Sequence, residues 1–447
     1  MTFHQSIHSP MKNLLLLASL LIVISCTDPV DDAESKQLNK LAEDYVRLGL
    51  TIGQYDDDFV DAYYGPDSLK PQTEPRDDFP RDSLLASVNE LMNEVGSISR
   101  TSANDSNKIR AGWLYDQLGA FNRRIRIFTE EYESFDDESR ALFGVVAPVY
   151  DEDFFKRSID ELDSILPGRG NVNNRFQRLA NQFVIPKDKL EPVINAAIAE
   201  ARKRTRAHYQ LPQTESFTLE FVTDKPWSGY NWYKGNYKSI VQINTDTKIT
   251  IDRAIDVGSH ESYPGHHVYN MLLEKHLYRD RGWVELSLYP LFSPQSLIAE
   301  GSANYGIEIA FPGNDKVHFA KTVLLPLAGL DTADADIYFK ALAIKGKLNY
   351  ARNEAARGLI NETMSRREAL NWLKKYGLMD NQTAEKSLDF IKKYRSYVIN
   401  YNYGQDLVKR YVEQNGGTAS APQKRWEIFG KLLSDLISPA NLAKSSR

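Results

Sequence analysis

The stretch HESYPGHH, residues 260–267, holds three of the eight histidines of this 447-residue chain, with a glutamate directly after the first. In the zinc-binding pattern His-Glu-x-x-His, two imidazoles four residues apart share one face of a helix, and the glutamate lies beside them. Here Pro264 stands where the second histidine of that pattern would be, and the next imidazoles belong to His266 and His267. The stretch therefore predicts a metal site with altered spacing, and the partner of His260 has to be identified.

Pro264 and the glycine after it predict a break in the helix that carries His260. Proline has no N–H to bond the carbonyl of His260, and its ring collides with that carbonyl. In a straight helix His266 would be rotated about 240° from His260 and His267 only about 20°, which favours His267. A two-residue bulge at Pro-Gly would instead bring His266 into the place of a ligand four residues on. The geometry alone leaves both histidines as candidates.

A carboxylate on a second helix is expected to complete the site, because a catalytic zinc takes about three protein ligands and one water. The stretch FSPQSLIAEGSANYGIEIAF, residues 292–311, predicts that helix, with its Ser-Pro pair as N-cap and first position. Glu300, Asn304 and Glu308 recur every four residues as a polar stripe on an otherwise apolar helix. A buried carboxylate needs a strong partner such as a dication. Glu308, with Asn304 in reserve, would orient an imidazole through a hydrogen bond.

HESYPGHH resembles the His-Glu-x-x-Pro-Gly-His signature of a bacterial family called domain of unknown function 885, which is similar to zinc-dependent peptidases of the gluzincin kind. The resemblance is strongest over residues 217–311. It implies that the histidine directly after Pro-Gly, His266, is the second ligand and His267 the reserve. Glu300 begins a segment that matches the family's Glu-Gly-x-Ala-x-Tyr, which implies that it is the third ligand. Glu261 is then implied as the general base.

Residues 394–411, YRSYVINYNYGQDLVKRY, lie where the family has an arginine and a tyrosine-rich segment. The resemblance implies that this segment supplies donors to the oxyanion that forms during amide hydrolysis, and the candidates are Arg395, Tyr401 and Tyr403. Packing of these aromatic side chains in the core of the fold is the alternative.

The overall pattern predicts a mainly α fold with a small central β-sheet. Apolar residues recur at helical spacing from about Lys36 onward. Residues 216–246 are instead rich in aromatic and β-branched residues, and SIVQIN (239–244) is the clearest strand. The resemblance implies a zincin-like, gluzincin-type helical peptidase architecture. It also implies that this strand pairs with the substrate backbone, with Gln242 and Asn244 near the cleft.

The stretch MKNLLLLASLLIVISC, residues 11–26, predicts a bacterial lipoprotein signal. Its apolar run is too short to span a bilayer as a helix but suits the core of a signal peptide. Cys26 is the only cysteine, so a lipid anchor is its expected use, with an ordinary signal peptide as the alternative. We divide the chain into a signal peptide (1–26), an acidic tether (27–35), an N-terminal helical region (36–205) and a catalytic region with the metal site (206–447).

The net charge of −5 gives no electrostatic reason to expect a nucleic acid partner. We expect a zinc-dependent hydrolase of the bacterial cell envelope, held outside the cytoplasm by a lipid on Cys26, either periplasmic or exposed at the cell surface. Zn²⁺ on His260, His266 and Glu300 would make it a metallopeptidase whose partner is a short peptide substrate. Two alternatives remain open: a zinc hydrolase of another amide or ester, and a non-catalytic lipoprotein that binds peptide or sugar.

Overall fold

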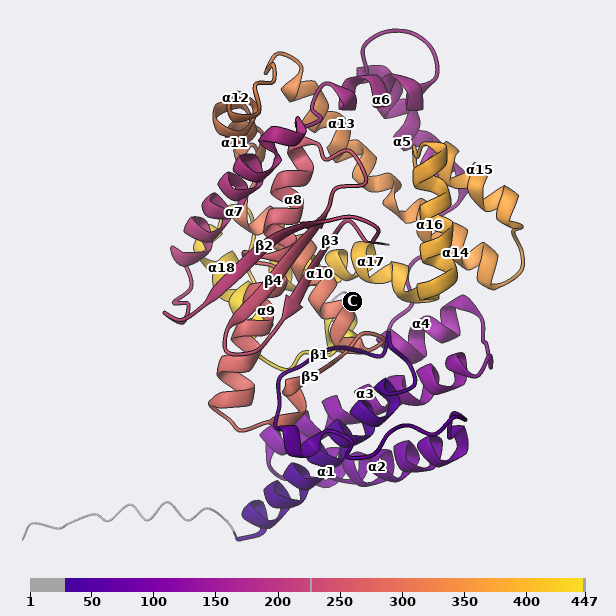
Figure 1. Ribbon diagram of the computed structural model, residues 1–447, viewed down its shortest axis with the longest axis vertical. Helices are drawn as coiled ribbons and strands as arrows, with labels where there is room; N and C mark the ends of the chain where they lie inside the picture. The colour runs from indigo at the N-terminus through magenta and orange to yellow at the C-terminus, as the bar shows by residue number, and fades with distance from the viewer. Residues whose placement is uncertain (1–28, 226, 445–447) are drawn as a thin grey trace, which may run out of the picture.

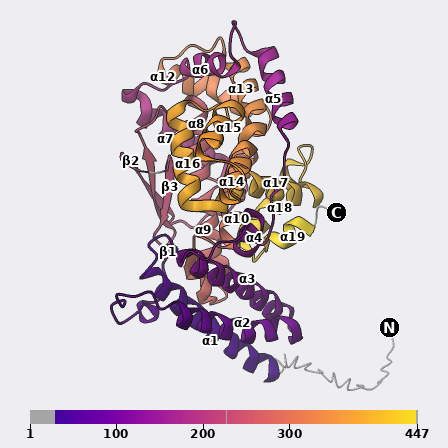
Figure 2. The same cartoon turned by 90° about the vertical axis from the view of Figure 1, so that its right-hand side faces the viewer.

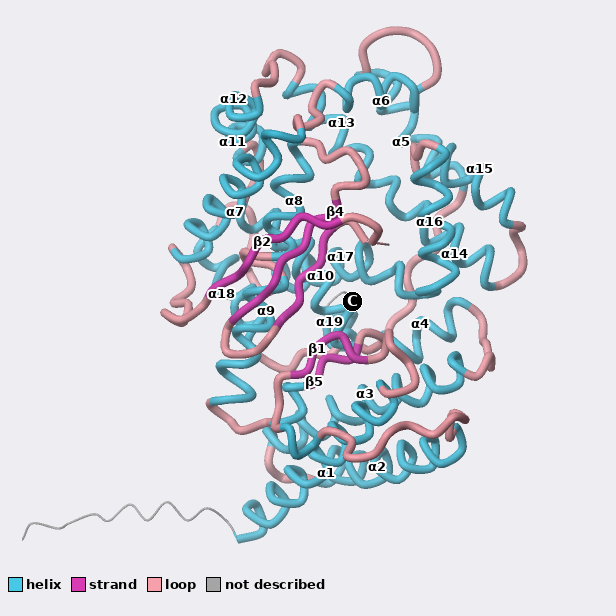
Figure 3. The backbone as a smooth tube through the Cα atoms, viewed as in Figure 1, coloured by secondary structure: helices cyan, strands magenta, loops and turns pink. Residues whose placement is uncertain are grey.

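The computed structural model describes residues 29–225 and 227–444, so Cys26 and the predicted signal peptide (1–26) lie outside the described residues. Helices dominate the described part, with two small sheets, which confirms the predicted mainly α fold (Figures 1 and 3). None of the helices in this part is both long and apolar enough to cross a membrane. Helix α1 begins at Pro29, so helix occupies most of the predicted tether (27–35), because extending a nucleated helix costs little.

The N-terminal helices form a layer at one end of the molecule, where α1, α2 and α3 pack on one another (Figures 1 and 2). Leu38, Leu41 and Tyr45 on one face of α1 are buried, as their three- and four-residue spacing predicts. The first seven helices are α1 (Pro29–Gly53), α2 (Arg81–Thr101), α3 (Asp105–Phe128), α4 (Phe135–Phe143), α5 (Glu152–Ile165), α6 (Val172–Asn181) and α7 (Leu190–Arg206).

A three-stranded sheet occupies the middle of the sequence. Its strands are β2 (Ser216–Val222), β3 (Gly229–Tyr233) and β4 (Lys238–Asn244), in the order β2-β4-β3. Strand β4 is therefore central, parallel to β2 and antiparallel to β3. A two-stranded antiparallel sheet joins β1 (Val60–Tyr63) to β5 (Leu288–Pro290), and so ties the N-terminal region to the catalytic region.

The central place of β4 corrects the interpretation of SIVQIN as the strand that pairs with substrate. Both edges of β4 are hydrogen-bonded to neighbouring strands, so no backbone groups are left for a peptide. The side chains of Gln242 and Asn244 are also used within the fold: Gln242 donates to Glu220, and Asn244 donates to the Lys225 and Trp227 carbonyls. The edge strand of the sheet that lines the cavity described below is β3.

Three helices carry the predicted ligands: α8 (Ile251–Glu261), α9 (His266–Leu273) and α10 (Pro294–Ala310). Helix α10 begins with Ser293 as N-cap and Pro294 at its first position, as predicted. It crosses α17 (Ile399–Gln414) so closely that a Cβ atom added to Gly301 would lie 2.4 Å from the carbonyl carbon of Gly404.

The remaining helices complete one connected hydrophobic core. Its buried residues run from Leu38 to Leu442, so the two predicted regions (36–205 and 206–447) share it. These helices are α11 (Asp315–Phe319), α12 (Leu325–Ala328), α13 (Ala335–Lys347), α14 (Ala351–Ile360), α15 (Arg366–Tyr376), α16 (Asn381–Tyr394), α18 (Pro422–Ser434) and α19 (Pro439–Lys444).

Substitution of Gly301 by alanine is expected to destabilise the fold, because its methyl group would force α10 and α17 apart. Overpacking of this kind typically costs about 1–3 kcal/mol. Urea denaturation measures the loss. Gly346→Ala in α13 is the matched control, because nothing lies within 4 Å of its added Cβ atom. Equal stability of both variants would contradict the tight crossing.

Candidate metal centre

The helix that carries the histidine motif breaks at the predicted place. Helix α8 ends at Glu261 and α9 begins at His266. Between them the Tyr263–Pro264 peptide bond is cis, and the Gly265 amide donates to the Ser259 carbonyl at 3.0 Å, which folds the loop back onto α8. A Cβ atom at Gly265 would lie 1.8 Å from the carbonyl oxygen of His260. Only glycine fits this close approach, so the Pro-Gly pair fixes where His266 starts the next helix.

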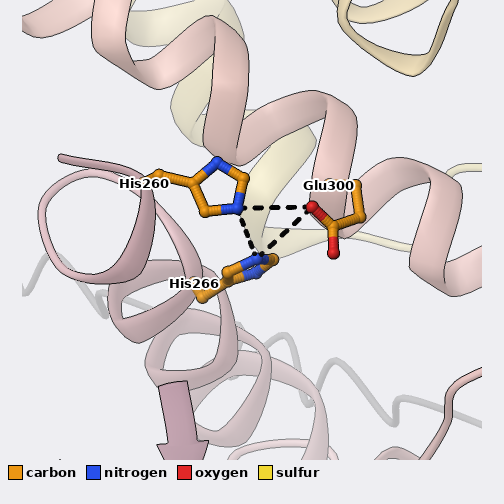
Figure 4. A group of neighbouring side chains, drawn as sticks. All are labelled: His260, His266 and Glu300. Carbon is orange, nitrogen blue, oxygen red and sulfur yellow. Dashed lines mark hydrogen bonds and ion pairs between the residues drawn. The ribbon is translucent and has the colours of Figure 1, made fainter. Parts of the chain in front are cut away.

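This break brings two imidazoles and a carboxylate together (Figure 4). The Nε2 atoms of His260 and His266 are 3.1 Å apart, and the Oε2 atom of Glu300 lies 3.3 Å from the first and 3.8 Å from the second. Zn–N bonds of about 2.0–2.1 Å in tetrahedral geometry place neighbouring ligand atoms about 3.3 Å apart. The three atoms are therefore spaced as zinc ligands, with room for a fourth on the open side.

Asn304 determines which nitrogen of His260 faces this triangle. The Nδ2 group of Asn304 donates to the Tyr401 carbonyl at 2.8 Å, so its Oδ1 atom is the acceptor for the His260 Nδ1–H at 3.0 Å. The Nε2 lone pair of His260 is then free to bind a cation. Asn304 thus takes the orienting role predicted for Glu308. That prediction is wrong, because Glu308 turns away to pair with Lys409 and Arg425.

Glu300 is buried, and its two oxygens have different surroundings. The hydroxyl of Tyr397 donates to Oε1 at 3.0 Å, whereas Oε2 receives no hydrogen bond from the described residues. Burial would raise the pKa of Glu300, but the imidazoles of His260 and His266 outweigh it and hold this pKa well below its usual range. A buried, charged oxygen without a donor is what a cation site requires. Tyr397 is not among the predicted site residues, because its local pattern does not distinguish it from the neighbouring tyrosines.

His267 points away from the triangle. It is fully buried, and its ring nitrogens lie 2.8 Å from Ser239 Oγ and 3.2 Å from Glu215 Oε2. The reserve role predicted for it as a ligand is therefore wrong, because the turn that brings His266 to His260 directs His267 toward the sheet. Glu215 also binds three further groups, namely the Tyr263 hydroxyl at 2.6 Å and the guanidinium groups of Arg202 and Arg206.

The Glu215 carboxylate thus holds the loop between α8 and α9 (262–265) on the side away from the triangle. Burial would raise the pKa of Glu215, but the hydrogen bonds from His267, Tyr263 and Arg202 lower it to about 2. The carboxylate is charged at neutral pH, and it fixes both Tyr263 in the loop and His267 at the start of α9.

Glu261 lies beside the triangle with its carboxylate uncommitted. It is 6% exposed, lines the cavity, and receives no side-chain hydrogen bond from the described residues on its carboxylate oxygens. Burial raises the pKa of Glu261 to about 7; His266 opposes the rise and Glu300 adds to it. A Cβ atom on Gly229 of β3 would lie 2.9 Å from Glu261 Oε1, so the glycine makes room for this carboxylate.

The predicted oxyanion donors separate into one that reaches the cavity and two that do not. Tyr401 lines the cavity that contains the triangle. Arg395 instead donates to the buried Glu138 at 2.6 Å, and Tyr403 does not line the cavity, so these two predictions are wrong. Arg395 caps the C-terminal end of α16. Tyr403 lies two positions after Tyr401 on α17, so helix rotation places it on a different face.

Asp61 is a cavity residue that the sequence analysis missed. It is the second residue of strand β1, and it accepts a hydrogen bond from the Tyr230 hydroxyl. Burial raises the pKa of Asp61 to about 6, whereas the hydrogen bond from Tyr230 lowers it. Only the pairing of β1 with β5 brings this residue near a motif some 200 positions away, so no local pattern could have indicated it.

The triangle opens into a cavity of about 1880 Å³. Its wall includes residues of β3, α8, α10, α13, α14, α16 and α17. Figure 1 shows the three-stranded sheet on one side of α10 and helices α14 and α16 on the other. A cavity of this size can enclose a short peptide or another molecule of similar size.

Comparison with known proteins gives weak structural likenesses. No family model matches the chain, and no curated protein matches it. A candidate lipoprotein from Colwellia psychrerythraea aligns with a TM-score of 0.49 and 14% identity over 81% of this chain, which spans 65% of that one. A candidate lipoprotein of unknown function from Shewanella oneidensis aligns with a TM-score of 0.43 and 10% identity, over 79% of this chain and 73% of that one.

A third structure, the M32 carboxypeptidase from Deinococcus radiodurans, aligns with a TM-score of 0.41 and 12% identity over 92% of this chain and 93% of that one. Likenesses this weak assign no function to this chain. The resemblance of the motif to the domain of unknown function 885 stays a prediction.

His266→Ala is expected to abolish stoichiometric zinc binding, whereas His267→Ala is expected to retain it and lose stability, because only His266 faces His260 and Glu300. Metal analysis after dialysis measures the first effect and thermal unfolding the second. Retention of zinc by His266→Ala with loss in His267→Ala would reverse the assignment.

Glu215→Gln is expected to destabilise the protein at neutral pH by about 1.5–3 kcal/mol, because a neutral amide replaces the buried carboxylate that accepts hydrogen bonds from partly exposed arginines. Because the pKa of Glu215 falls from 4.5 to about 2 on folding, its stabilisation is complete above about pH 4.5 and is lost as the pH falls toward 2. Denaturant titrations at several pH values measure the free energy of unfolding, which should fall less steeply between pH 4.5 and 2 in the variant than in the wild type. Glu427→Gln on the surface is the control. An equally steep fall in Glu215→Gln and the wild type would contradict the role of Glu215.

Proposed function

We propose that this protein is a zinc-dependent hydrolase, with His260, His266 and Glu300 as metal ligands and Glu261 as the general base. The observation that carries the proposal is the triangle of ligand atoms 3.1–3.8 Å apart around a buried carboxylate oxygen without a donor. Two imidazoles and one carboxylate suit zinc, whereas calcium and magnesium prefer oxygen ligands throughout. The open side of the triangle faces the cavity, as a catalytic site requires.

In the proposed mechanism, different side chains bind the metal, transfer the proton and orient the ligands. A bound zinc ion would supply Lewis acidity, polarising a carbonyl and lowering the pKa of water toward neutrality. Glu261 is placed to take a proton from the water that attacks the carbonyl carbon and to pass it to the leaving nitrogen as the C–N bond breaks. Asn304 holds His260 in the tautomer that binds a cation, and Tyr397 orients Glu300.

Strand β3 supports a peptide as the substrate. It is an edge strand that lines the cavity, so the backbone groups on its free edge can pair with an extended chain. Trp227, Tyr230 and Trp232 add aromatic surface beside that edge. Tyr401 is the candidate to donate a hydrogen bond to the oxyanion, because it lines the same cavity. We therefore propose a metallopeptidase for short peptides, anchored in the cell envelope through Cys26.

Glu261→Gln is expected to retain zinc and to lower kcat/KM for peptides by about 10²–10⁴-fold, because general base catalysis typically contributes this much. Turnover of a mixed peptide library, read by mass spectrometry, measures the loss, and metal analysis shows that the site stays loaded. Glu308→Gln on α10 is the matched control, because its carboxylate is paired with Lys409 and Arg425 rather than with the ligands. Wild-type turnover by Glu261→Gln would contradict the mechanism.

A further inference from the structure

Three cationic side chains line the cavity beyond the metal centre without a carboxylate partner. Arg253 lies on α8, Lys345 near the end of α13 and Arg352 at the start of α14. Within residues 29–225 and 227–444, none of them forms an ion pair. Arg253 donates only to Ser228 Oγ at 3.2 Å, and Lys345 and Arg352 lie near the aromatic rings of Phe176 and Phe390. We call these three side chains the basic cluster.

Other lysines of the cavity wall are neutralised. Lys321 pairs with Asp336 at 2.6 Å and Lys393 with Asp58 at 2.9 Å, while Lys316 and Lys409 pair with Asp256 and Glu308. Asp252 attracts Lys345 without forming an ion pair with it, and its carboxylate accepts a hydrogen bond from the Tyr338 hydroxyl at 2.6 Å. Three positive charges thus face one nearby carboxylate that is paired with none of them, which leaves net positive charge for a ligand.

Partial burial makes the unpaired charge of Lys345 and Arg352 costly, whereas Arg253 is exposed. Burial lowers the pKa of both Lys345 and Arg352. Arg253 adds to the effect on both groups, and Asp252 opposes it at Lys345, as Tyr401 does at Arg352. An anion placed among the three groups would relieve both the desolvation and the repulsion. Arginine in particular can bind a carboxylate through two parallel hydrogen bonds.

The position of Arg253 relates the basic cluster to the metal centre. Arg253 and His260 are seven residues apart on α8, so they share one face of the helix and lie about 10.5 Å apart along its axis. An extended peptide spans about 3.3–3.6 Å per residue, so this separation corresponds to about three residues. On the β1 side of the centre the cavity wall is acidic, with Asp61 near His266 and Glu300.

We propose that Arg253, Lys345 and Arg352 form a subsite for a substrate carboxylate, within about three residues of the bond that is cleaved. This inference rests on the proposed hydrolase function for the choice of bond, but the subsite itself is a binding property. The carboxylate can come from the C-terminus of a short peptide or from an acidic side chain. With a C-terminal carboxylate, the enzyme would release one to three residues from the end of the peptide.

Calorimetric titration of the zinc-loaded full chain carrying Glu261→Gln tests the subsite without turnover. The probes are N-acetyl-trialanine, its C-terminal amide, and N-acetyl-Ala-Glu-Ala amide. We expect the free acid to bind about ten-fold or more tightly than its amide. Lys345→Gln and Arg352→Gln, each added to the Glu261→Gln chain, should weaken binding of the acid to the level of the amide and leave binding of the amide unchanged.

Lys321→Gln is the matched control, a cavity lysine already paired with Asp336, and it should leave the preference for the acid intact. Tight binding of the glutamate-containing amide would identify a side-chain carboxylate as the ligand, and weak binding would identify the C-terminus. Equal affinity for all three probes, or equal losses for the carboxylate-bearing and carboxylate-free probes in Lys345→Gln, would overturn the proposal. If the carboxylate-bearing probes bind selectively but the wild type hydrolyses no peptide, the subsite stands and the proposed peptidase function is refuted. If the wild type hydrolyses peptides with and without the carboxylate equally well, the peptidase function stands and the subsite is refuted.

Discussion

The close approach of Gly265 to the end of α8 is the constraint on which the candidate metal centre depends. The Gly265 amide bonds the Ser259 carbonyl, and its Cα atom leaves no space for a side chain beside His260. This contact ends one helix and starts the next within four residues, so that two histidines six positions apart meet at 3.1 Å. A continuous helix would direct them to different faces, and no carboxylate on α10 could then reach both.

The rest of the fold holds this break in place from two sides. Behind the loop, Glu215 binds Tyr263 and His267 and so fixes the loop and the start of α9 to the sheet region. In front, the crossing of α10 and α17 at Gly301 and Gly404 sets the depth of Glu300. Between these two supports, the Oε2 atom of Glu300 is left without a hydrogen bond from the described residues, at the position where a cation is expected.

Charge is distributed unevenly along the cavity. Carboxylates gather around the metal centre, at Glu261, Glu300 and Asp61, whereas the basic cluster lies further along α8 and on α13 and α14. A peptide with two free termini carries opposite charges at its ends, so in the proposed hydrolase this arrangement would favour one direction of binding. It would also separate the groups proposed for hydrolysis from those proposed to select the substrate, so that different variants test the two functions.

Local pattern in the sequence determined the mainly α fold, the small sheet, the helix break and the start of α10, because helical spacing, proline and glycine act over a few residues. It also offered His260, His266 and Glu300 as ligands, by the spacing of the motif and a family resemblance. The tertiary structure alone decided that Asn304 rather than Glu308 orients His260, that His267 turns to Glu215, and that β3 rather than β4 is the cleft edge. Those choices depend on helix rotation and strand order, which are fixed by packing between segments tens to hundreds of residues apart. Asp61, Tyr397 and the basic cluster likewise come from distant segments, and so only the folded chain shows them together.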